Sequence, residues 1–457
     1  NCIIQSNAEG ISNNNASPFI LYSLIQGIDN GNNGNIPGTT NPQFRSAVSH
    51  LDAPTLSGNY RLTAASPCIN VGSDEAMANP IGVDLDGVAR RIGCTTDMGA
   101  YEFTTPPDIP TINSDNIGNR TLCAGGSTSF TVSGTNATIG YGWQVNTGSG
   151  YTFLTNGGNY SGVNTPTLQI SNVTPSMSGF QYRCLAIGCP PAAVSAEATL
   201  TVLPTTLYVD ASIPASGDGA SWATAFKTLG EALTTAHQCT SAAVNIYVAQ
   251  GTYYPTGSQN ATDRNTSFTI SRGNIKIYGG YSSGGAIRAI SVYPTILSGD
   301  IGTLNNHSDN SYHVMVIAGL PTAADSVVLD GFTFTRGNAD GTSQFVYNGQ
   351  LVGRAGGGAI ALYANANANK VSISQCNFLY NNASFGGGAL DIRTAGPAIS
   401  NCRFENNSAE YGGAVYHDKA TTVFTGCVFL NNTAGSSGGA LASDYDSQCS
   451  LTSCQFE

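Results

Sequence analysis

Charged residues are scarce in this chain. Asp, Glu, Lys and Arg make up 10% of its 457 residues, whereas an ordinary soluble domain carries roughly 25%. Asn, Ser, Thr and Gly therefore have to keep the surface hydrated. The 17 basic residues are outnumbered by 28 acidic ones, which gives a formal charge of −11. This charge argues against a nucleic-acid partner and against an anionic membrane surface.

The chain also has no long apolar run. No segment approaches the roughly 18 apolar residues that a membrane-spanning helix needs, and the sequence does not open on the basic-then-apolar pattern of a signal peptide. Membrane insertion is therefore not expected. With 41% hydrophobic residues the chain can bury a core, and its length allows two to four domains. Its 12 Cys residues are too sparse for a disulfide scaffold.

A sequence repeat occupies residues 356 to 457. Gly-Gly-Ala recurs at intervals of 30, 25 and 26 residues, and a Cys-x-Phe unit follows each copy. The Gly-Gly-Ala copies begin at Gly357, Gly387, Gly412 and Gly438, and the Cys-x-Phe units begin at Cys376, Cys402, Cys427 and Cys454. Alternation of apolar and polar residues around each Cys-x-Phe predicts a short strand. A period of this length is typical of one coil of a parallel β-solenoid.

Coils of a solenoid stack about 4.8 Å apart, so equivalent side chains lie above one another. We therefore expect one buried stack of the four Phe residues, Phe378, Phe404, Phe429 and Phe456, and a second stack of the four Cys residues. Gly would form the turns, and Asn at the corners would form hydrogen bonds with backbone N–H and C=O groups that lack a partner in the strands. The stacked Cys side chains point the same way, which favours buried free thiols over disulfides. A row of metal ions bound along the Cys stack is disfavoured because no His belongs to the repeat.

Residues 207 to 335 have the features of the opening of the same solenoid. Apolar residues from Ser221 to Ala236 recur at helical spacing, with Ser221 as the N-cap, and this is the one helix that the sequence predicts. A helix here would cover the core and the edge of the first coil. Apolar strands follow, and Phe332-Thr333-Phe334 replaces Cys-x-Phe in the last of them. An insertion from about 340 to 355 is either a contact surface or a neutral decoration.

These residues resemble a known family. The GGA and FxxN repeats are similar to those of polymorphic outer-membrane proteins and related right-handed parallel β-helix proteins. The runs LYVDASIPASGDGASWATAFKTLGEAL, VAQGTYYPT, NSYHV and LDGFTFTRGNA resemble the N-terminal half of large β-helix surface proteins of Bacteroidota-type bacteria. The resemblance covers most of residues 205 to 457. It implies an exported, extracellular or surface protein, often delivered by a type IX secretion system.

The first 104 residues resemble the other end of the same family. Cys2-Ile3-Ile4 and Ser23-Leu24-Ile25 align as two coils, and YRLTAASPCINVGS, VDLDGVARRIG and TDMGAYEF resemble the family's closing cap. A disulfide between Cys68 and Cys94 is expected, because a cap with little core benefits from a staple. Asp84 and Asp86 could be calcium ligands, but a capped turn is favoured since the other ligands of an EF-hand loop are missing.

A different module lies between two Pro-marked boundaries, at residues 107 to 203. Trp143 and the run Tyr182-Arg183-Cys184 resemble the core Trp and the tyrosine corner of an immunoglobulin sandwich, and an unrelated β-sandwich is the alternative. Phe130 stands where the first sandwich Cys would fall, which puts the standard inter-sheet disulfide in doubt. The pairing of Cys123, Cys184 and Cys189 stays open.

The best cluster for chemistry is Tyr416-His417-Asp418-Lys419, with Asp391 one coil earlier and Asp444 and Asp446 one coil later. This spacing could place them on one outward edge, where some parallel β-helix lyases and hydrolases carry their catalytic groups. Charged residues in a turn between coils of low charge are more often simply exposed to solvent. No phosphate loop, paired-Cys metal motif or nucleophile elbow occurs. We therefore predict that the chain is not an enzyme, and that it has no catalytic, cofactor-binding or metal-binding residues and no cofactor.

The sequence thus predicts an all-β chain, in which right-handed parallel β-helix segments flank an Ig-like β-sandwich and one helix caps a β-helix. The expected domains are the final coils and cap of a β-helix at 1–104, the sandwich at 105–204, and the first coils of a second β-helix at 205–457. The expected function is that of an extracellular structural or adhesive repeat protein, part of a large surface protein or fibre. The alternative is a polysaccharide lyase, a hydrolase or a glycan-binding module.

Partners are expected at both ends of the chain, because it starts and stops inside a coil. They would be neighbouring repeats of a longer polypeptide, or copies of a fibre subunit stacked end to end. Surface glycans or other cells are further candidate partners, whereas nucleic acid is not.

Overall fold

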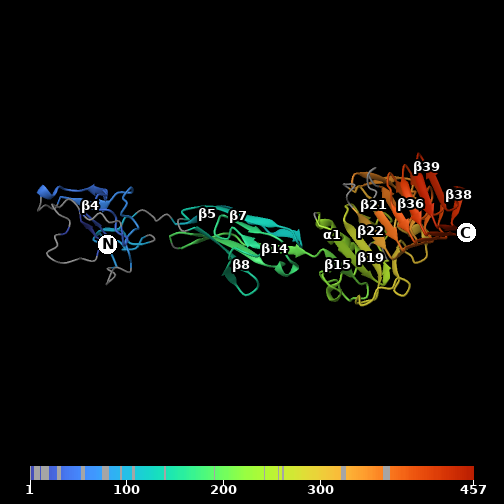
Figure 1. The fold of residues 1–457 in the computed structure, drawn as a ribbon, viewed down its shortest axis with the longest axis horizontal. Helices are drawn as coiled ribbons and strands as arrows, with labels where there is room; N and C mark the ends of the chain where they lie inside the picture. The colour runs from blue at the N-terminus through green and yellow to red at the C-terminus, as the bar shows by residue number, and fades with distance from the viewer. Residues whose placement is uncertain are drawn as a thin grey trace. The chain divides into compact units, whose positions relative to one another are not determined.

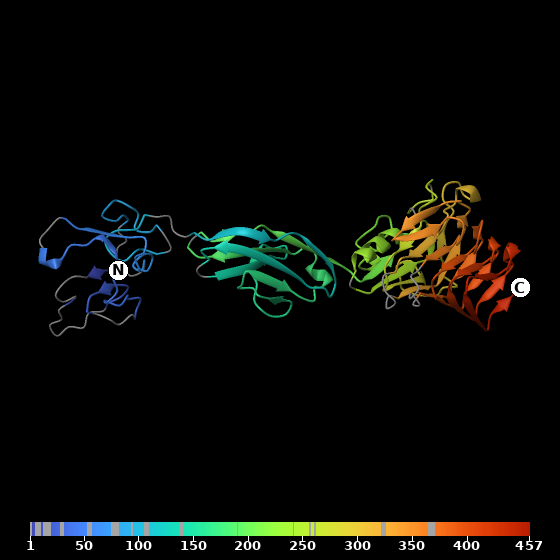
Figure 2. The ribbon, with the colours of Figure 1, turned by 90° about the horizontal axis from the view of Figure 1, so that it is seen from above.

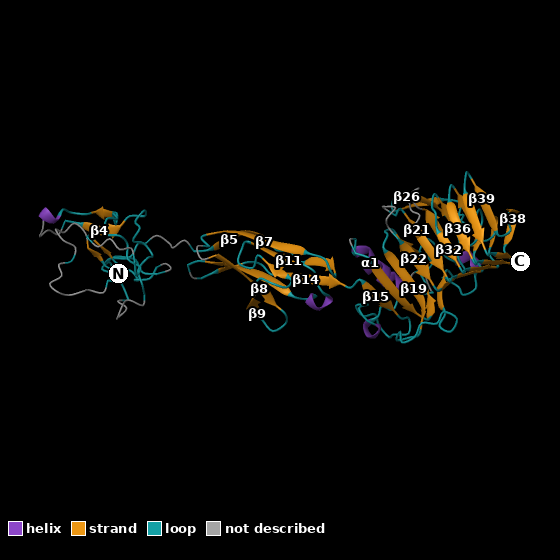
Figure 3. Cartoon of the chain, viewed as in Figure 1, coloured by secondary structure: helices purple, strands orange, loops and turns teal. Residues whose placement is uncertain are grey.

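The computed structural model describes residues 2–4, 11, 20–27, 32–52, 57–74, 82–92, 95–104, 109–137, 140–189, 191–240, 242–255, 257–259, 262–320, 326–363 and 371–457. They belong to two compact units. One contains Asn1–Arg120, Ser127–Ser171 and Gly179–Thr201, and the other contains Thr121–Gly126, Asn172–Ser178 and Val202–Glu457. Strands dominate both units, and α1 (Leu229–Gln238) is the one α-helix of the described residues (Figures 1 and 3). The fold class predicted from the sequence is confirmed.

The N-terminal residues contain a short parallel pair. Strand β1 (Ile3–Ile4) pairs with β2 (Leu24–Ile25) in the predicted register, Ile3 beside Leu24 and Ile4 beside Ile25. An antiparallel pair follows, formed by β3 (Phe44–Ser46) and β4 (Asn59–Leu62), with the 3-10 turn η1 (His50–Asp52) between them. These pairs leave a small core of Leu24, Leu62, Cys68 and Met98.

The predicted disulfide of Cys68 is wrong. Cys68 has a free, fully buried thiol, and Cys94, its expected partner, lies outside the described residues. The Cys68 side chain packs against Leu62 and Met98, so it fills the cap core as a small apolar group. Burial raises the pKa of this thiol to about 11.

The middle of the chain is a β-sandwich of two antiparallel sheets (Figure 2). The first sheet runs in the order β10 (Tyr160–Ser161), β11 (Thr167–Ile170), β7 (Thr128–Thr135) and β5 (Thr111–Asn116). The second runs in the order β6 (Arg120–Cys123), β14 (Ala198–Leu203), β12 (Gln181–Ile187), β8 (Gly140–Asn146) and β9 (Tyr151–Phe153), with β13 (Ala193–Val194) beside β12. The 3-10 turn η2 (Pro175–Met177) precedes β12.

An aromatic cluster replaces the inter-sheet disulfide of the sandwich. Phe130 on β7 stacks on Trp143 of β8 with the ring centroids 6.3 Å apart, and Tyr182 of β12 lies 5.6 Å from Phe130. All three side chains are fully buried. Cys184, beside Trp143 in the strand register, is a buried free thiol. The doubt about the standard disulfide, raised by Phe130, is therefore confirmed.

The C-terminal part is a parallel β-helix with three long sheets. The first contains β15 (Thr206–Val209), β16 (Val244–Ala249), β19 (Ile275–Tyr281), β22 (Val327–Asp330), β28 (Val371–Ser374), β32 (Ala398–Ser400), β36 (Thr421–Thr425) and β40 (Gln448–Thr452). The second contains β17 (Gly251–Tyr253), β20 (Thr295–Ser298), β23 (Phe332–Thr335), β29 (Asn377–Leu379), β33 (Arg403–Glu405), β37 (Val428–Leu430) and β41 (Gln455–Phe456).

The third long sheet contains β18 (Phe268–Ile270), β21 (Met315–Ala318), β27 (Ile360–Tyr363), β31 (Leu390–Arg393), β35 (Val415–Asp418) and β39 (Leu441–Asp444). A short fourth sheet at one corner contains β24 (Asn338–Ala339), β30 (Asn382–Ala383), β34 (Ser408–Tyr411) and β38 (Thr433–Ser437). One 3-10 turn, η4 (His307–Asp309), precedes β21.

The predicted helix begins later than its apolar pattern suggests. Ser221 caps only the 3-10 turn η3 (Trp222–Thr224), and α1 starts after Thr228. Phe226 between them is extended, because its backbone bonds to Tyr208 and Asp210 next to β15. Thr228 and Glu231 form a capping box, a Thr-x-x-Glu signal that was present in the sequence. None of the described helices has the length and apolar character to cross a membrane.

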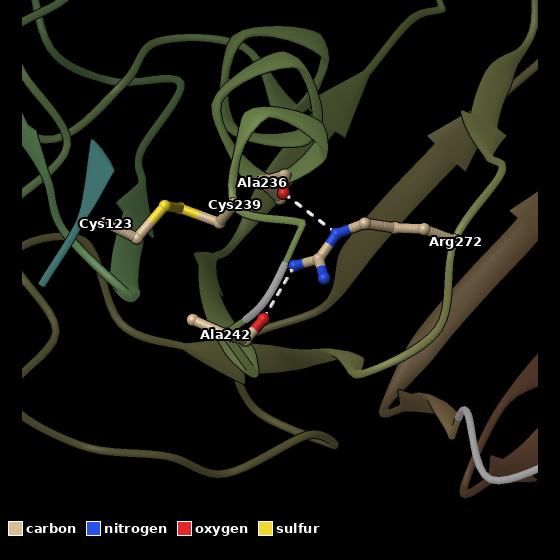
Figure 4. Close-up of a disulfide and its surroundings, with 5 residues drawn as sticks. All are labelled: Cys123, Ala236, Cys239, Ala242 and Arg272. Carbon is tan, nitrogen blue, oxygen red and sulfur yellow. Dashed lines mark hydrogen bonds between the residues drawn. A yellow bond between two sulfur atoms is a disulfide. The ribbon is translucent and has the colours of Figure 1, made fainter. Parts of the chain in front are cut away.

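A disulfide that the sequence did not predict joins Cys123 at the end of β6 to Cys239, just after α1 (Figure 4). The two Cα atoms are 5.5 Å apart, and the two Cys are 116 positions apart along the chain. Nearby, the Arg272 guanidinium donates to the carbonyl oxygens of Ala236 and Ala242, which satisfies carbonyl groups around the helix end. Cys189 also takes part in a disulfide.

The predicted Phe stack is confirmed. Adjacent rings from Phe378 to Phe456 are nearly parallel, with centroids 4.7 to 4.8 Å apart, and Phe334 extends the stack at 5.2 Å. Phe404 is fully buried, but Phe456 is 50% exposed, because a ring covers it on one side only. The Cys side chains of the same coils are free thiols, buried except for Cys454.

A ladder of Asn side chains runs along the corner next to the Phe stack. The side-chain amides of Asn381, Asn407 and Asn432 donate to carbonyl oxygens at Phe334, Phe378 and Phe404, respectively. The Asn407 side-chain oxygen accepts from the backbone N–H of Asn381, one coil earlier. The FxxN repeat therefore satisfies backbone groups where the chain turns, as predicted.

The repeated Gly pairs serve two purposes. The first Gly of each pair has a positive φ, as in Gly387 at 62°, which ordinary side chains rarely adopt. A Cβ on the second Gly, for example Gly388, would collide with the carbonyl oxygen of Gly413 in the next coil. The Gly pair thus allows both the turn and the close stacking of coils.

Candidate functional site

The charged cluster lies on the outer face of the third sheet. Strands β31, β35 and β39 place Asp391, Tyr416 and Ala442 at one register level, and Arg393, Asp418 and Asp444 at the next level. Side chains alternate along a strand, so both levels face outward. The residues between them, including His417, face the core.

Asp391 is the centre of this polar cluster and is fully buried. Its carboxylate accepts a 2.7 Å hydrogen bond from the Tyr363 hydroxyl and two 3.1 Å bonds from the Arg393 guanidinium. Burial raises the pKa of Asp391, although the nearby Arg393 charge opposes the rise. The carboxylate is therefore held by protein donors and has no contact with solvent.

Arg393 joins two carboxylates on neighbouring strands. Its guanidinium lies 3.5 Å from Asp418 as well as 3.1 Å from Asp391, and it also lies over the rings of Tyr363 and Tyr416 at 5.3 and 5.8 Å. The Arg393 side chain is 30% exposed. The single positive charge thus offsets part of the negative charge of the two carboxylates from the solvent side.

The remaining candidates are spread along the last two coils. The Tyr416 hydroxyl donates to Asp444 at 3.1 Å, and the Lys419 ammonium lies 5.6 Å from the centre of the Tyr445 ring. Asp446 is exposed in a turn. The structure therefore brings Asp391, Asp418 and Asp444 onto one face. Arg393 forms ion pairs with Asp391 and Asp418, and Tyr416 donates a hydrogen bond to Asp444.

His417 does not belong to this face, so the suggested outward edge is wrong for this residue. Its ring is fully buried, with Nδ1 3.2 Å from the Ser443 hydroxyl and its centroid 5.9 Å from that of Phe424. Burial lowers the pKa of His417 to about 4. Period-two alternation between Tyr416 and Asp418 already implied the inward orientation.

The sequence interpretation missed Tyr363 and Arg393, and the repeat held the signal for both. Counted from the Ala of each Gly-Gly-Ala, the fourth following residue is Tyr363, Arg393, Asp418 or Asp444. The structure pairs these four residues across β27, β31, β35 and β39. Aligning all four repeats would therefore have identified them as one outward row.

The insertion at 340–355 covers part of the same face. It forms an antiparallel hairpin of β25 (Gln344–Tyr347) and β26 (Gln350–Gly353). Val352 is fully buried in a cluster with Val316, Ala318, Ala361 and Tyr363 of the third sheet, and the Gly353 N–H donates to the Tyr363 hydroxyl. The hairpin therefore packs on the sheet, while Val346 and Leu351 on its other side are exposed.

Two of the candidate residues, Asp391 and His417, are enclosed by the protein. A general acid or base has to reach its substrate within roughly 2.6–3.2 Å, but Asp391 is enclosed and His417 faces the core. Within the described residues, no group of three or more His, Cys, Asp or Glu side chains is arranged to hold a metal ion. As it stands, the cluster cross-links adjacent coils.

Asp84 and Asp86 are also engaged by protein groups. The Asp84 carboxylate accepts from the backbone N–H groups of Asp86, Val88 and Glu102. Burial alone would raise its pKa, but these hydrogen bonds lower it below its ordinary value. Asp86 forms an ion pair with Arg61. The pair of Asp residues is thus built into a capped turn.

Comparison with known proteins gives partial likenesses. No family model and no curated protein matches the chain. A structure of tandem Ig repeats of Dlar is 24% identical (TM-score 0.18) and matches over 24% of this chain and 53% of its own. The RIG-5 IG1 homodimer is 20% identical (TM-score 0.17), with 21% of this chain and 97% of its own covered.

A pectin methylesterase solved with hexasaccharide VII is 16% identical (TM-score 0.27), with 49% of this chain and 54% of its own covered. The chain thus spans about half the length of the Dlar and pectin methylesterase structures. The fold assignment rests on the strand pairing described above.

Proposed function

We propose that this chain is part of an extracellular structural or adhesive protein that presents rigid β-helix rods at a cell surface. The supporting observation is the ladder of Phe and Asn side chains, which repeats from coil to coil with stacked rings and paired amides. Such ladders resist bending because every coil is bonded to the next. A rod of this kind suits a spacer or a repeated binding surface.

The Cys123–Cys239 disulfide supports an extracellular location. Disulfides persist in oxidising compartments and are rare in the cytosol. The low charge content of the chain fits the same setting. The resemblance of the repeats to Bacteroidota-type surface proteins further suggests export by a type IX system.

The proposal includes a non-enzymatic role. The strongest support is that Asp391, the buried carboxylate of the best polar cluster, is bonded to Tyr363 and Arg393. Partners in this proposal are neighbouring repeats, surface glycans or other cells. The net charge of −11 disfavours nucleic acid as a partner.

A bead assay tests the proposal. Beads coated with the chain, and control beads coated with the heat-unfolded chain, are passed under flow over bacterial cells and over immobilised polysaccharides, and reducing ends are measured in the effluent. We expect retention of the folded chain without product release. Product release that is lost in Asp391→Asn or Asp418→Asn would instead establish the lyase or hydrolase alternative, and equal retention of both bead types would refute adhesion.

A further inference from the structure

A groove of about 310 Å³ lies beside the short fourth sheet, and none of its lining residues belongs to the charged cluster. Its lining includes His307, Asn338, Tyr380, Asn382, Asn406 and Ser408. None of its described lining residues is Asp, Glu, Lys or Arg. The volume is at the lower end of the range for small-molecule pockets, roughly 300–1,000 Å³. The groove therefore suits a small uncharged ligand or a short segment of a polymer.

A row of hydrogen-bonded polar side chains lines the groove. The Asn382 amide donates to the Asn338 side-chain oxygen at 2.7 Å, and the Ser408 hydroxyl donates to the Asn382 oxygen at 2.7 Å. Asn338 in turn donates to the His307 carbonyl oxygen at 2.8 Å. Both N–H groups of the Asn338 amide are used, since it also donates to Asp340, whereas Asn382 keeps one N–H donor and both side-chain oxygens keep acceptor capacity. The row is thus preorganised to bond hydroxyl groups without reordering.

Tyr380 forms one side of the groove in an unusual backbone conformation. Its φ is 57°, in the left-handed region, which disfavours bulky side chains. The equivalent corner positions in the next two coils carry Asn406 and Asn431, with φ values of 55° and 51°. Asn tolerates this region better than Tyr does. The corner itself therefore gives no reason for an aromatic residue.

Packing does not explain Tyr380 either. Its side chain is 54% exposed, and it has no ring contact or side-chain hydrogen bond with the described residues. Residues held in unfavourable backbone conformations without structural benefit are concentrated at functional sites. Tyr380 thus presents a free aromatic face beside a row of amides.

We propose that this groove binds a neutral oligosaccharide. One face of a pyranose ring carries C–H groups that pack on an aromatic ring, while its hydroxyls exchange hydrogen bonds with amides and hydroxyls. Tyr380 supplies the ring, and Asn382, Asn406 and Ser408 supply the polar groups. The lack of formal charge among these residues selects neutral over acidic sugars. The inference rests on the adhesive role proposed above and assigns it a site.

Affinity electrophoresis of the whole chain tests this site. The gels contain soluble glucan, mannan, xylan or galactan, with polygalacturonate as the acidic comparison. We expect at least one neutral polysaccharide to slow migration. Tyr380→Asn should weaken that binding by about tenfold, the loss of one aromatic contact, and Tyr380→Phe should retain most of it.

Stability separates a binding role from a structural one. Because Asn is the better residue at this corner, the thermal midpoint of Tyr380→Asn should equal or exceed that of the wild type. Tyr445→Asn is the matched control, since Tyr445 is also exposed with a positive φ of 43° but does not line the groove. It should leave binding unchanged.

Three outcomes would overturn the inference: no retardation by any neutral polysaccharide, stronger retardation by polygalacturonate, or equal binding by wild type and Tyr380→Asn. Bead retention by the Tyr380→Asn variant at the wild-type level would then leave the adhesive role standing without this site. Loss of adhesion in both proteins would refute the adhesive role itself.

Discussion

Phe404 lies between two rings of the core stack, 4.7 Å from Phe378 and 4.8 Å from Phe429. Replacing it with Ala would open a cavity that the neighbouring coils cannot close, because their backbones are bonded in register. We expect Phe404→Ala to lower the free energy of unfolding by about 3–5 kcal/mol. A guanidinium titration followed by circular dichroism measures this loss.

Phe456→Ala is the matched control for this prediction. Phe456 belongs to the same stack but is 50% exposed, so its truncation removes less buried surface and should cost about 1 kcal/mol. Equal losses in the two variants would show that stacking does not depend on burial.

His417 makes the β-helix sensitive to acid. Burial lowers its pKa to about 4 from an ordinary value of 6.5, so the folded state favours the neutral ring. The resulting stabilisation is complete above pH 6.5 and is lost as the pH falls through 4, and over that window it amounts to about 3 kcal/mol. We expect His417→Leu to flatten the dependence of stability on pH between 6.5 and 4.

The comparison for this experiment is His313, which is also buried with a pKa lowered to about 4. It remains in the His417→Leu variant, so part of the acid sensitivity should persist. Thermal midpoints at pH 7, 5.5 and 4 give the result. An unchanged slope in the variant would contradict the assignment.

At the scale of single elements, the Asn ladder bonds the backbone groups at the corner of each coil and so stabilises the turn. Asn407 is fully buried, and its side chain bonds the Phe378 carbonyl oxygen and the Asn381 N–H. Asn407→Ala removes the acceptor of the Asn381 N–H, one donor to the Phe378 carbonyl oxygen and the side-chain bonds to Asn381 and Asn432, at roughly 1–3 kcal/mol for each buried group left unpaired. We expect a loss of about 3 kcal/mol and faster hydrogen exchange at the N–H of Asn381.

Asn377→Ala is the control for the ladder. Asn377 is partly exposed on β29, and its side chain makes one long contact, 3.4 Å, with the Thr333 hydroxyl. Its replacement should change stability by less than about 0.5 kcal/mol. A comparable loss in both variants would mean that the corner position of Asn407 has no special importance.

The start of helix α1 could not be predicted from the spacing of apolar residues. The apolar spacing from Trp222 onward is helical, yet Phe226 pairs with the backbone beside β15 and the helix starts at Leu229. A tertiary contact outweighs helix propensity over these few residues. The capping box at Thr228 and Glu231 was a local signal for the true start.

At the scale of the whole molecule, the Cys123–Cys239 disulfide closes a long loop around the start of the β-helix. Removing a native disulfide typically costs 2–5 kcal/mol. We expect Cys123→Ser/Cys239→Ser to lower the thermal midpoint by several degrees and to increase proteolysis near residues 121–126. Cys2→Ser, which changes an exposed free thiol, is the control and should change neither. A double variant with wild-type stability would refute a stabilising role.

The periodic features of this protein follow from its amino-acid sequence. The spacing of Gly-Gly-Ala, Cys-x-Phe and Phe-x-x-Asn fixes the coil length, the Phe stack and the Asn ladder, because a stacked repeat brings equal positions together. The same alternation would have placed His417 inside and Arg393 outside. In the sandwich, Phe130 in place of Cys was enough to cast doubt on the usual disulfide.

Contacts between distant segments become visible only in the three-dimensional fold. The bond from Cys123 to Cys239 spans 116 residues, and several Cys residues competed as partners. The hairpin of β25 and β26 packs on Tyr363 through Val352, and the groove at Tyr380 includes His307 from a loop more than 70 residues earlier. No local pattern encodes such pairings, because they depend on how loops of irregular length fold back onto a regular frame.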